Sequence, residues 1–206
     1  MTDRQSAARR SLELAVLTLG ALTLGACASS PPTRFFTLDA VAPGARAAEV
    51  RARTPLKVDA VHIPPALDRT SMVRGLSGNQ LEISSQDRWA GDLGETIRRV
   101  LTQDLASRLP PGMVIAPDAP PPANARGIVV DILTFQPRGA GEVVLDADWT
   151  LLEGSQSHPV LSRSEHLTVT AASTAQGEAA AMSTLLGHLA QRMAAAIGAA
   201  GSGGSG

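Results

Sequence analysis

The chain of 206 residues has very little cysteine and few aromatic side chains. Its one cysteine is Cys27, so no disulfide can form within the chain. Three phenylalanines, two tryptophans and no tyrosine leave a core that must be built from aliphatic side chains and alanine. The only lysine, Lys57, follows Leu56 and precedes Val58, which excludes the Gly-Lys-Ser or Gly-Lys-Thr of a Walker A nucleotide site.

Familiar catalytic and metal-binding motifs are also missing. The sequence has no Gly-x-Ser-x-Gly elbow. Its four histidines are scattered without helical spacing, which argues against a zinc site. Asp146 and Asp148 lie two apart and resemble paired catalytic carboxylates, but a solvated face of a strand is the favoured interpretation. We therefore expect a protein that is not an enzyme and that holds no metal.

No apolar run is long enough to cross a membrane. The uncharged run from Leu14 to Leu24 has about eleven residues, far below the roughly 18 to 20 of a spanning helix. Arginines precede this run and Gly25-Ala26 end it, as in a signal peptide over residues 1–26. The pair Arg9-Arg10 also fits a twin-arginine signal, so both export routes stay open.

Leu24-Gly25-Ala26-Cys27 matches a bacterial lipobox. The pattern predicts a diacylglycerol on the Cys27 sulfur and an acyl chain on its freed amine, enough to anchor the protein stably without a spanning helix. No other cofactor is expected. Ala28, in place of aspartate after the cysteine, favours the outer membrane, facing the periplasm. The alternative is a plain signal peptide whose cysteine falls near the cleavage point.

Charge argues against nucleic acid as a partner. Cleavage after residue 26 removes three of the 18 basic and two of the 19 acidic residues, leaving 15 and 17. A nucleic-acid binder normally shows an excess of basic side chains on one face.

Hydrophobic periodicity predicts an α+β domain over residues 34–198, with a lipidated tether at 27–33 and a flexible Gly/Ser tail at 199–206. Two amphipathic helices are expected to pack on one face of an antiparallel sheet. The helix predictions cover a segment capped at Ser85 to Asp87 that ends at Leu109, and residues 178–200. The strand predictions cover residues 34–41, 55–64, a hairpin over 71–85, 113–117, 127–136, 142–153 and 159–170.

Three segments in register resemble the PqiC/YmbA family of ABC-transport auxiliary lipoproteins. They are "RFFTL" at 34–38, "IPPALDRTSMV" at 63–73 and "DRWAGDLGETIRRVLTQDLASRL" at 87–109. The chain departs from the family pattern at Phe35-Phe36, where tyrosines are usual, and at Gly91-Asp92, where Glu-Pro is more common. The resemblance covers roughly residues 27–195.

The resemblance implies a non-catalytic outer-membrane lipoprotein that serves an intermembrane lipid transport system. Its implied partners are an MCE-domain periplasmic tunnel protein, inner-membrane permease and ATPase components, and further copies of itself in a ring. A structural or assembly lipoprotein of the envelope is the alternative. The apolar stripe of each predicted helix is narrow, so packing on the sheet accounts for all of it and leaves no apolar surface to line a lipid cavity. We therefore expect the protein to dock a partner and not to carry lipid itself.

An exposed loop and the following helix start are the predicted contact with the tunnel protein, since Trp and Arg are common interface anchors. The alternative is that Asp68 and Arg69 pair locally and that Trp89 packs on the sheet. The candidate residues are Pro64, Leu67, Asp68, Arg69, Arg88 and Trp89.

Overall fold

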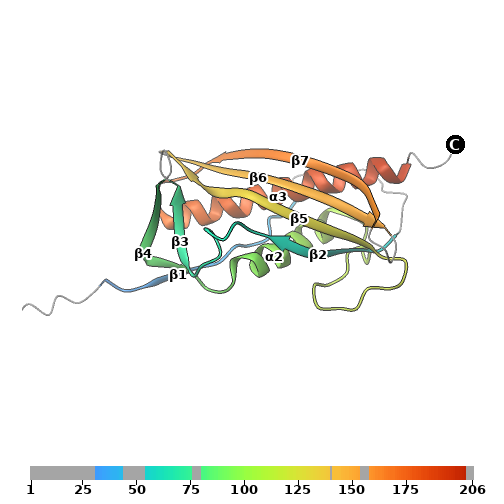
Figure 1. Cartoon of the computed structure of the whole chain (residues 1–206), viewed down its shortest axis with the longest axis horizontal. Coiled ribbons are helices and arrows are strands. Elements are labelled where there is room, and N and C mark those ends of the chain that lie inside the picture. The colour runs from blue at the N-terminus through green and yellow to red at the C-terminus, as the bar shows by residue number, and fades with distance from the viewer. Residues whose placement is uncertain (1–30, 44–53, 76–79, 140, 154–157, 203–206) are drawn as a thin grey trace, which may run out of the picture. The chain divides into compact units, whose positions relative to one another are not determined.

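The computed structural model describes residues 31–43, 54–75, 80–139, 141–153 and 158–202. Cys27 and the predicted signal peptide lie outside these ranges. The strands are β1 (Arg34–Phe36), β2 (Leu56–His62), β3 (Ser71–Gly75), β4 (Leu81–Trp89), β5 (Arg126–Arg138), β6 (Glu142–Glu153) and β7 (His158–Thr170). The helices are α2 (Leu93–Arg108) and α3 (Ala175–Ser202) (Figure 1). Within the described ranges, neither helix is long and apolar enough to cross a membrane.

The strands form two sheets, which confirms the α+β class but corrects the sheet type. Sheet A has the order β1-β4-β3 and sheet B the order β2-β5-β6-β7. The pairs β1–β4 and β2–β5 are parallel, so both sheets are mixed rather than purely antiparallel. Alternation along a strand shows which of its faces is buried, but it does not show which strand lies beside it. Parallel pairing of β2 with β5 requires a long crossover connection, and the chain between these two strands includes α2.

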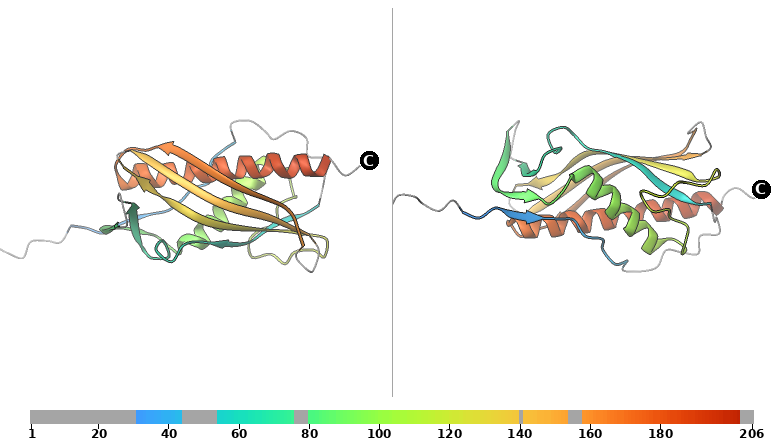
Figure 2. Two further views of the ribbon diagram at one scale, coloured as in Figure 1. Left: turned by 45° about the horizontal axis from the view of Figure 1, so that its top comes forward. Right: turned by 90° about the horizontal axis from the view of Figure 1, so that it is seen from below.

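Strand β6 lies at the centre of the core, as its alternation predicts. Val143, Leu145, Ala147, Trp149 and Leu151 are each at most 1% exposed. Helices α2 and α3 cover this one face of sheet B, and the opposite face is open (Figure 2). The prediction of two helices on one face is therefore confirmed.

Several element boundaries differ from the sequence predictions. Strand β4 runs through Trp89, where the first helix was expected, and α2 starts at Leu93 because the Asp92 side chain accepts a 2.8 Å hydrogen bond from the Glu95 amide. The first strand ends at Phe36, and residues 113–117 contribute only the bridge from Val114 to Leu56. Helix α3 continues to Ser202, into the segment predicted as a tail.

Two glycines near helix starts predict opposite effects of the same substitution. A Cβ at Gly177 in α3 would lie 2.6 Å from the Ala172 carbonyl oxygen, whereas a Cβ at Gly94 in α2 would meet nothing closer than 3.5 Å. Helix propensity favours alanine over glycine by up to about 1 kcal/mol. We expect Gly94→Ala to stabilise the fold by up to that amount and Gly177→Ala to destabilise it by about 1 to 3 kcal/mol. Urea unfolding of both variants tests this, and equal gains would contradict the tight contact.

Candidate functional site

The segment between β2 and β3 is a hydrogen-bonded turn. The Pro64 carbonyl oxygen accepts from the Leu67 amide at 2.8 Å and from the Asp68 amide at 3.3 Å. The Arg69 Nε donates to the Ala66 carbonyl oxygen at 2.9 Å, and Leu67, 5% exposed, reaches into the core. These contacts fix the turn and leave the Asp68 and Arg69 side chains exposed.

The structure brings the six predicted contact residues together, with different roles. Trp89 donates its amide to the Thr70 carbonyl oxygen at 2.7 Å, which joins the end of β4 to the turn. Its side chain is only 6% exposed and packs in the core, as the alternative interpretation held. Arg88 is half-buried opposite Ser71. Leu67 and Trp89 therefore position the turn, while Asp68 and Arg69 face solvent.

A groove of about 440 Å³ adjoins the turn, and we call it the β2–α2 groove. It lies between β2, the turn and the first turns of α2. Its charged and titratable lining comes from all three: Asp59, His62, Asp68, Asp92, Glu95 and Arg98. Four carboxylates against one guanidinium give the groove a negative potential that would favour cationic groups.

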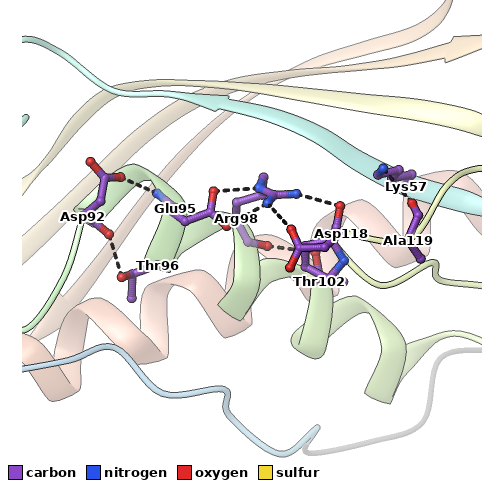
Figure 3. A network of polar contacts seen from close by, with 9 residues as sticks. Lys57, Asp92, Glu95, Thr96, Arg98, Thr102, Asp118 and Ala119 are labelled. Carbon is purple, nitrogen blue, oxygen red and sulfur yellow. Dashed lines mark hydrogen bonds and ion pairs between the residues drawn. The ribbon is translucent and has the colours of Figure 1, made fainter.

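Arg98 links the groove to the loop that follows α2 (Figure 3). Its guanidinium donates to both Glu95 carboxylate oxygens at 2.9 and 2.7 Å, to Asp118 at 3.3 Å and to the Pro117 carbonyl oxygen at 3.1 Å. The hydrogen bond with Glu95 is the main cause that raises the pKa of Arg98 above its ordinary value. Lys57 donates to the Ala119 carbonyl oxygen at 2.9 Å and holds the same loop against β2. Polar contacts within the chain thus hold Arg98 of the groove lining and the neighbouring loop in place.

Asp59 is a partly buried carboxylate in the lining of the groove. Partial burial raises its pKa, and the nearby Lys57 lowers it by a smaller amount. Raised acid pKa values occur at functional sites and also in structural polar clusters. Together with Asp68, Asp92 and Glu95, Asp59 gives the groove an excess of acidic side chains, which suits recognition of a positively charged surface.

The two aspartates of β6 lie away from this groove, on the open face of sheet B. Asp146 accepts a 2.5 Å hydrogen bond from His166 on β7, and this bond is the main cause that lowers the pKa of Asp146. Asp148 stands opposite Asp131 on β5. Across the part of the chain that the structure describes, no three side chains of metal-ligand type gather closely enough to hold a metal ion.

Sequence reasoning missed Asp59, Glu95 and Arg98 as members of one site. Each lies on the polar face of its own helix or strand, so the sequence pattern does not distinguish it from any other charged surface residue. Only the position of α2 beside β2 brings them together, and nothing in the periodicity of either segment reports that contact.

Comparison with known proteins now gives the family. The family model described as "ABC-type transport auxiliary lipoprotein component" matches residues 36–194, which include the turn, the groove, helix α2 and most of α3. The chain belongs to this family. As an ABC-type transport auxiliary lipoprotein, it is a component of a transport system of the cell envelope, and the family prediction made from the sequence is confirmed.

Among curated proteins, this auxiliary lipoprotein is similar to the intermembrane transport lipoprotein PqiC of Escherichia coli (strain K12). The two are 27% identical over 138 residues, which is 66% of this chain and 72% of PqiC.

Among solved structures, an uncharacterised protein matches with a TM-score of 0.69 at 21% identity, covering 81% of this chain and 99% of its own. A Xanthomonas campestris protein matches with a TM-score of 0.64 at 13% identity, covering 82% of this chain and 96% of its own. At these identities both show the shared fold alone.

Proposed function

We propose that this auxiliary lipoprotein is a non-catalytic outer-membrane component that docks an MCE-domain periplasmic tunnel protein. The observation that carries the proposal is the family match over residues 36–194. The turn and the β2–α2 groove both lie within this range. The similarity to an intermembrane transport lipoprotein supports transport between membranes. Permease and ATPase components in the inner membrane, and a ring of copies of this chain, are further parts of the proposal.

The predicted anchor keeps the domain close to its membrane. Acylation of Cys27 would leave the six residues Ala28–Thr33 before β1. Fully extended, such a segment reaches about 20 Å. A domain held this closely meets its partner within the periplasm next to the membrane surface, as a docking component must.

Docking rests on a rigid, charged surface. Asp68 and Arg69 stand exposed on a turn whose backbone is hydrogen-bonded, and the groove beside it carries excess negative charge. Rigid contact groups lose little conformational entropy on binding, and charge complementarity selects the partner. We infer that the tunnel protein presents basic side chains to this groove.

A site-specific cross-link tests the docking surface. A photoreactive residue would replace Asp68 in the full lipoprotein in cells, and Glu142, an exposed acid at the start of β6, would be replaced as the matched control. We expect irradiation to join position 68, but not position 142, to the MCE-domain protein. Adducts from both positions alike, or adducts from position 68 with outer-membrane assembly factors only, would contradict the proposed docking.

A further inference from the structure

Strand β7 is an open edge of sheet B. The order of the sheet is β2-β5-β6-β7, so β7 pairs with β6 on one side and, within the described residues, with no strand on the other (Figure 1). It has 13 residues, and most of their side chains are exposed. A long edge strand presents a row of unpaired N–H and C=O groups that can pair with a further strand.

The opposite edge of sheet B is partly covered by the chain itself. On β2, Leu56 donates its amide to the Met113 carbonyl oxygen at 2.8 Å and accepts at its own carbonyl oxygen from the Ile115 amide at 2.8 Å. Lys57 fastens the same loop through the Ala119 carbonyl oxygen. Strand β7 is therefore the edge that stays open along its length. Two copies of the chain that join these edges form a symmetric pair, in which both copies use the same surface.

The charges of β7 select one register for such a pair. When two antiparallel strands are related by a twofold axis, one residue lies opposite its own copy, and its two neighbours lie opposite each other. Arg163 on the axis would bring two arginines together, and Glu165 on the axis two glutamates. With Ser164 on the axis, Arg163 of each copy lies opposite Glu165 of the other copy. Opposite charges across a strand pair stabilise it and like charges destabilise it, so the Ser164 register is favoured over both neighbours.

Both charged side chains can take a further partner. Arg163 is exposed and donates to the Ser162 carbonyl oxygen at 3.0 Å. The half-buried Glu165 carboxylate lies 3.8 Å from Arg192 of α3, which is beyond hydrogen-bond distance. The cross-strand neighbours of Arg163 and Glu165 on β6 are uncharged core residues, so both side chains lie on the side of the sheet that the helices cover. A second copy would thus supply each charge with the counter-ion that β6 does not offer.

Apolar side chains flank the two charges. In the Ser164 register, Leu161 of one copy lies opposite Leu167 of the other, and both leucines already pack in or against the core. Pro159 cannot donate to a strand partner, and the pairing of β6 with β7 is irregular beside it. Pairing between copies is therefore expected over residues 161–167, with an ion pair and a leucine pair on each side of the axis.

We propose that sheet B of one copy continues into sheet B of a second copy through antiparallel pairing of their β7 strands, with Ser164 on the twofold axis. The two four-stranded sheets then form one, with the open faces on one side and the helices on the other. This pair differs from the ring of the proposed function, because copies in a ring meet through two different surfaces. It rests on β7 and does not depend on docking of the tunnel protein.

A cysteine at the axis tests the pairing. Residues directly opposite in antiparallel strands have Cα atoms about 4.5 to 5.5 Å apart, a separation that a disulfide can bridge. The full lipoprotein carrying Ser164→Cys is oxidised in cell envelopes and separated on a non-reducing gel. Thr168→Cys is the matched control, because it is exposed on the same strand and lies about 27 Å from its own copy in this register. Any disulfide from an unacylated Cys27 appears in the unsubstituted protein as well, which separates a failure of the proposed anchor from a failure of the pairing.

Reversal of one charge tests the register. Arg163→Glu turns both attractive cross-strand pairs into repulsive ones, so it should raise the dissociation constant of the lipoprotein pair in detergent by about tenfold or more. Arg138→Glu makes the same change at an exposed arginine of β5 and should leave that constant unchanged. Sedimentation equilibrium measures both variants, and circular dichroism confirms that each is folded.

Disulfide-linked dimers from position 164, and none from position 168, are the expected result. Equal cross-linking at both positions would show random collision, and an absence of dimers at position 164 would show that β7 does not pair with its own copy; either outcome overturns the inference. A larger assembly that forms without a cross-link at position 164 would overturn it too, because another surface would then join the copies. An equal dissociation constant for Arg163→Glu and Arg138→Glu would contradict the register.

Discussion

Replacement of Asp104 by alanine is expected to lower the free energy of unfolding by about 3 to 5 kcal/mol. The Asp104 side chain is 0% exposed, and that of its partner Arg108 is 4% exposed at a distance of 3.0 Å. Burial is the main cause that raises the pKa of Asp104, against the lowering by Val41 and Arg108. Removal of the carboxylate leaves a guanidinium charge in the core with no counter-ion.

The pair also holds other parts of the fold in place. The Asp104 carboxylate accepts from the Val41 amide at 2.9 Å, so it fastens the segment after β1 to α2. Arg108 extends toward α3, where a Cβ at Gly187 would lie 3.2 Å from its guanidinium. The single substitution therefore weakens the contact between the two helices and the N-terminal segment at once.

A double variant separates the charge effect from packing. Asp104→Leu together with Arg108→Met leaves no unpaired charge and should recover most of the lost stability, although the Val41 amide loses its acceptor. Urea unfolding followed by circular dichroism measures all three proteins. A loss below about 1 kcal/mol for Asp104→Ala would show that the buried ion pair is not formed as described.

Replacement of Trp149 by alanine is expected to cost about 3 to 5 kcal/mol because it opens a cavity at the centre of the core. Trp149 is 0% exposed in the middle strand pair of sheet B. Its indole Nε1 finds no hydrogen-bond acceptor among the described residues. A buried donor without a partner is itself destabilising, so Trp149→Phe should cost much less than the alanine substitution.

The same unfolding experiment checks this second effect against a surface control. Leu133→Ala on the open face of sheet B should stay within about 0.5 kcal/mol of wild type, because that side chain is 57% exposed. If Trp149→Phe were as destabilising as Trp149→Ala, the indole N–H would have to be satisfied, and the core would differ from the one described.

The sequence could predict most of the elements but not how they pair. The alternation in β6 predicts its buried face because solvent and core act on every second side chain, and the structure has that face buried. Pairing of β2 with β5 joins residues that are 69 or 70 positions apart in the chain, which no local pattern reports. Trp89 shows the same limit. It fits the helical spacing of α2 but lies at the end of β4, because the helix is capped by Asp92 and begins only at Leu93.

The candidate site divides in a similar way. The residues near the turn could be found because they stand together in the sequence, in a segment that resembles a known family. Asp59 and Arg98 could not, since they come from separate elements and share the groove only after folding. The lipobox cysteine, Cys27, lies outside the described residues, so its acylation stays a prediction.

Purification of the native lipoprotein from detergent-solubilised cell envelopes, with mass spectrometry of the proteins that accompany it, tests the central claim most directly. Cys27→Ser, which cannot be acylated on sulfur, serves as the control. Recovery of an MCE-domain protein together with its permease, and loss of both with Cys27→Ser, is the predicted result. Recovery of outer-membrane assembly factors in their place would contradict the account and indicate that this family domain serves envelope assembly in this protein.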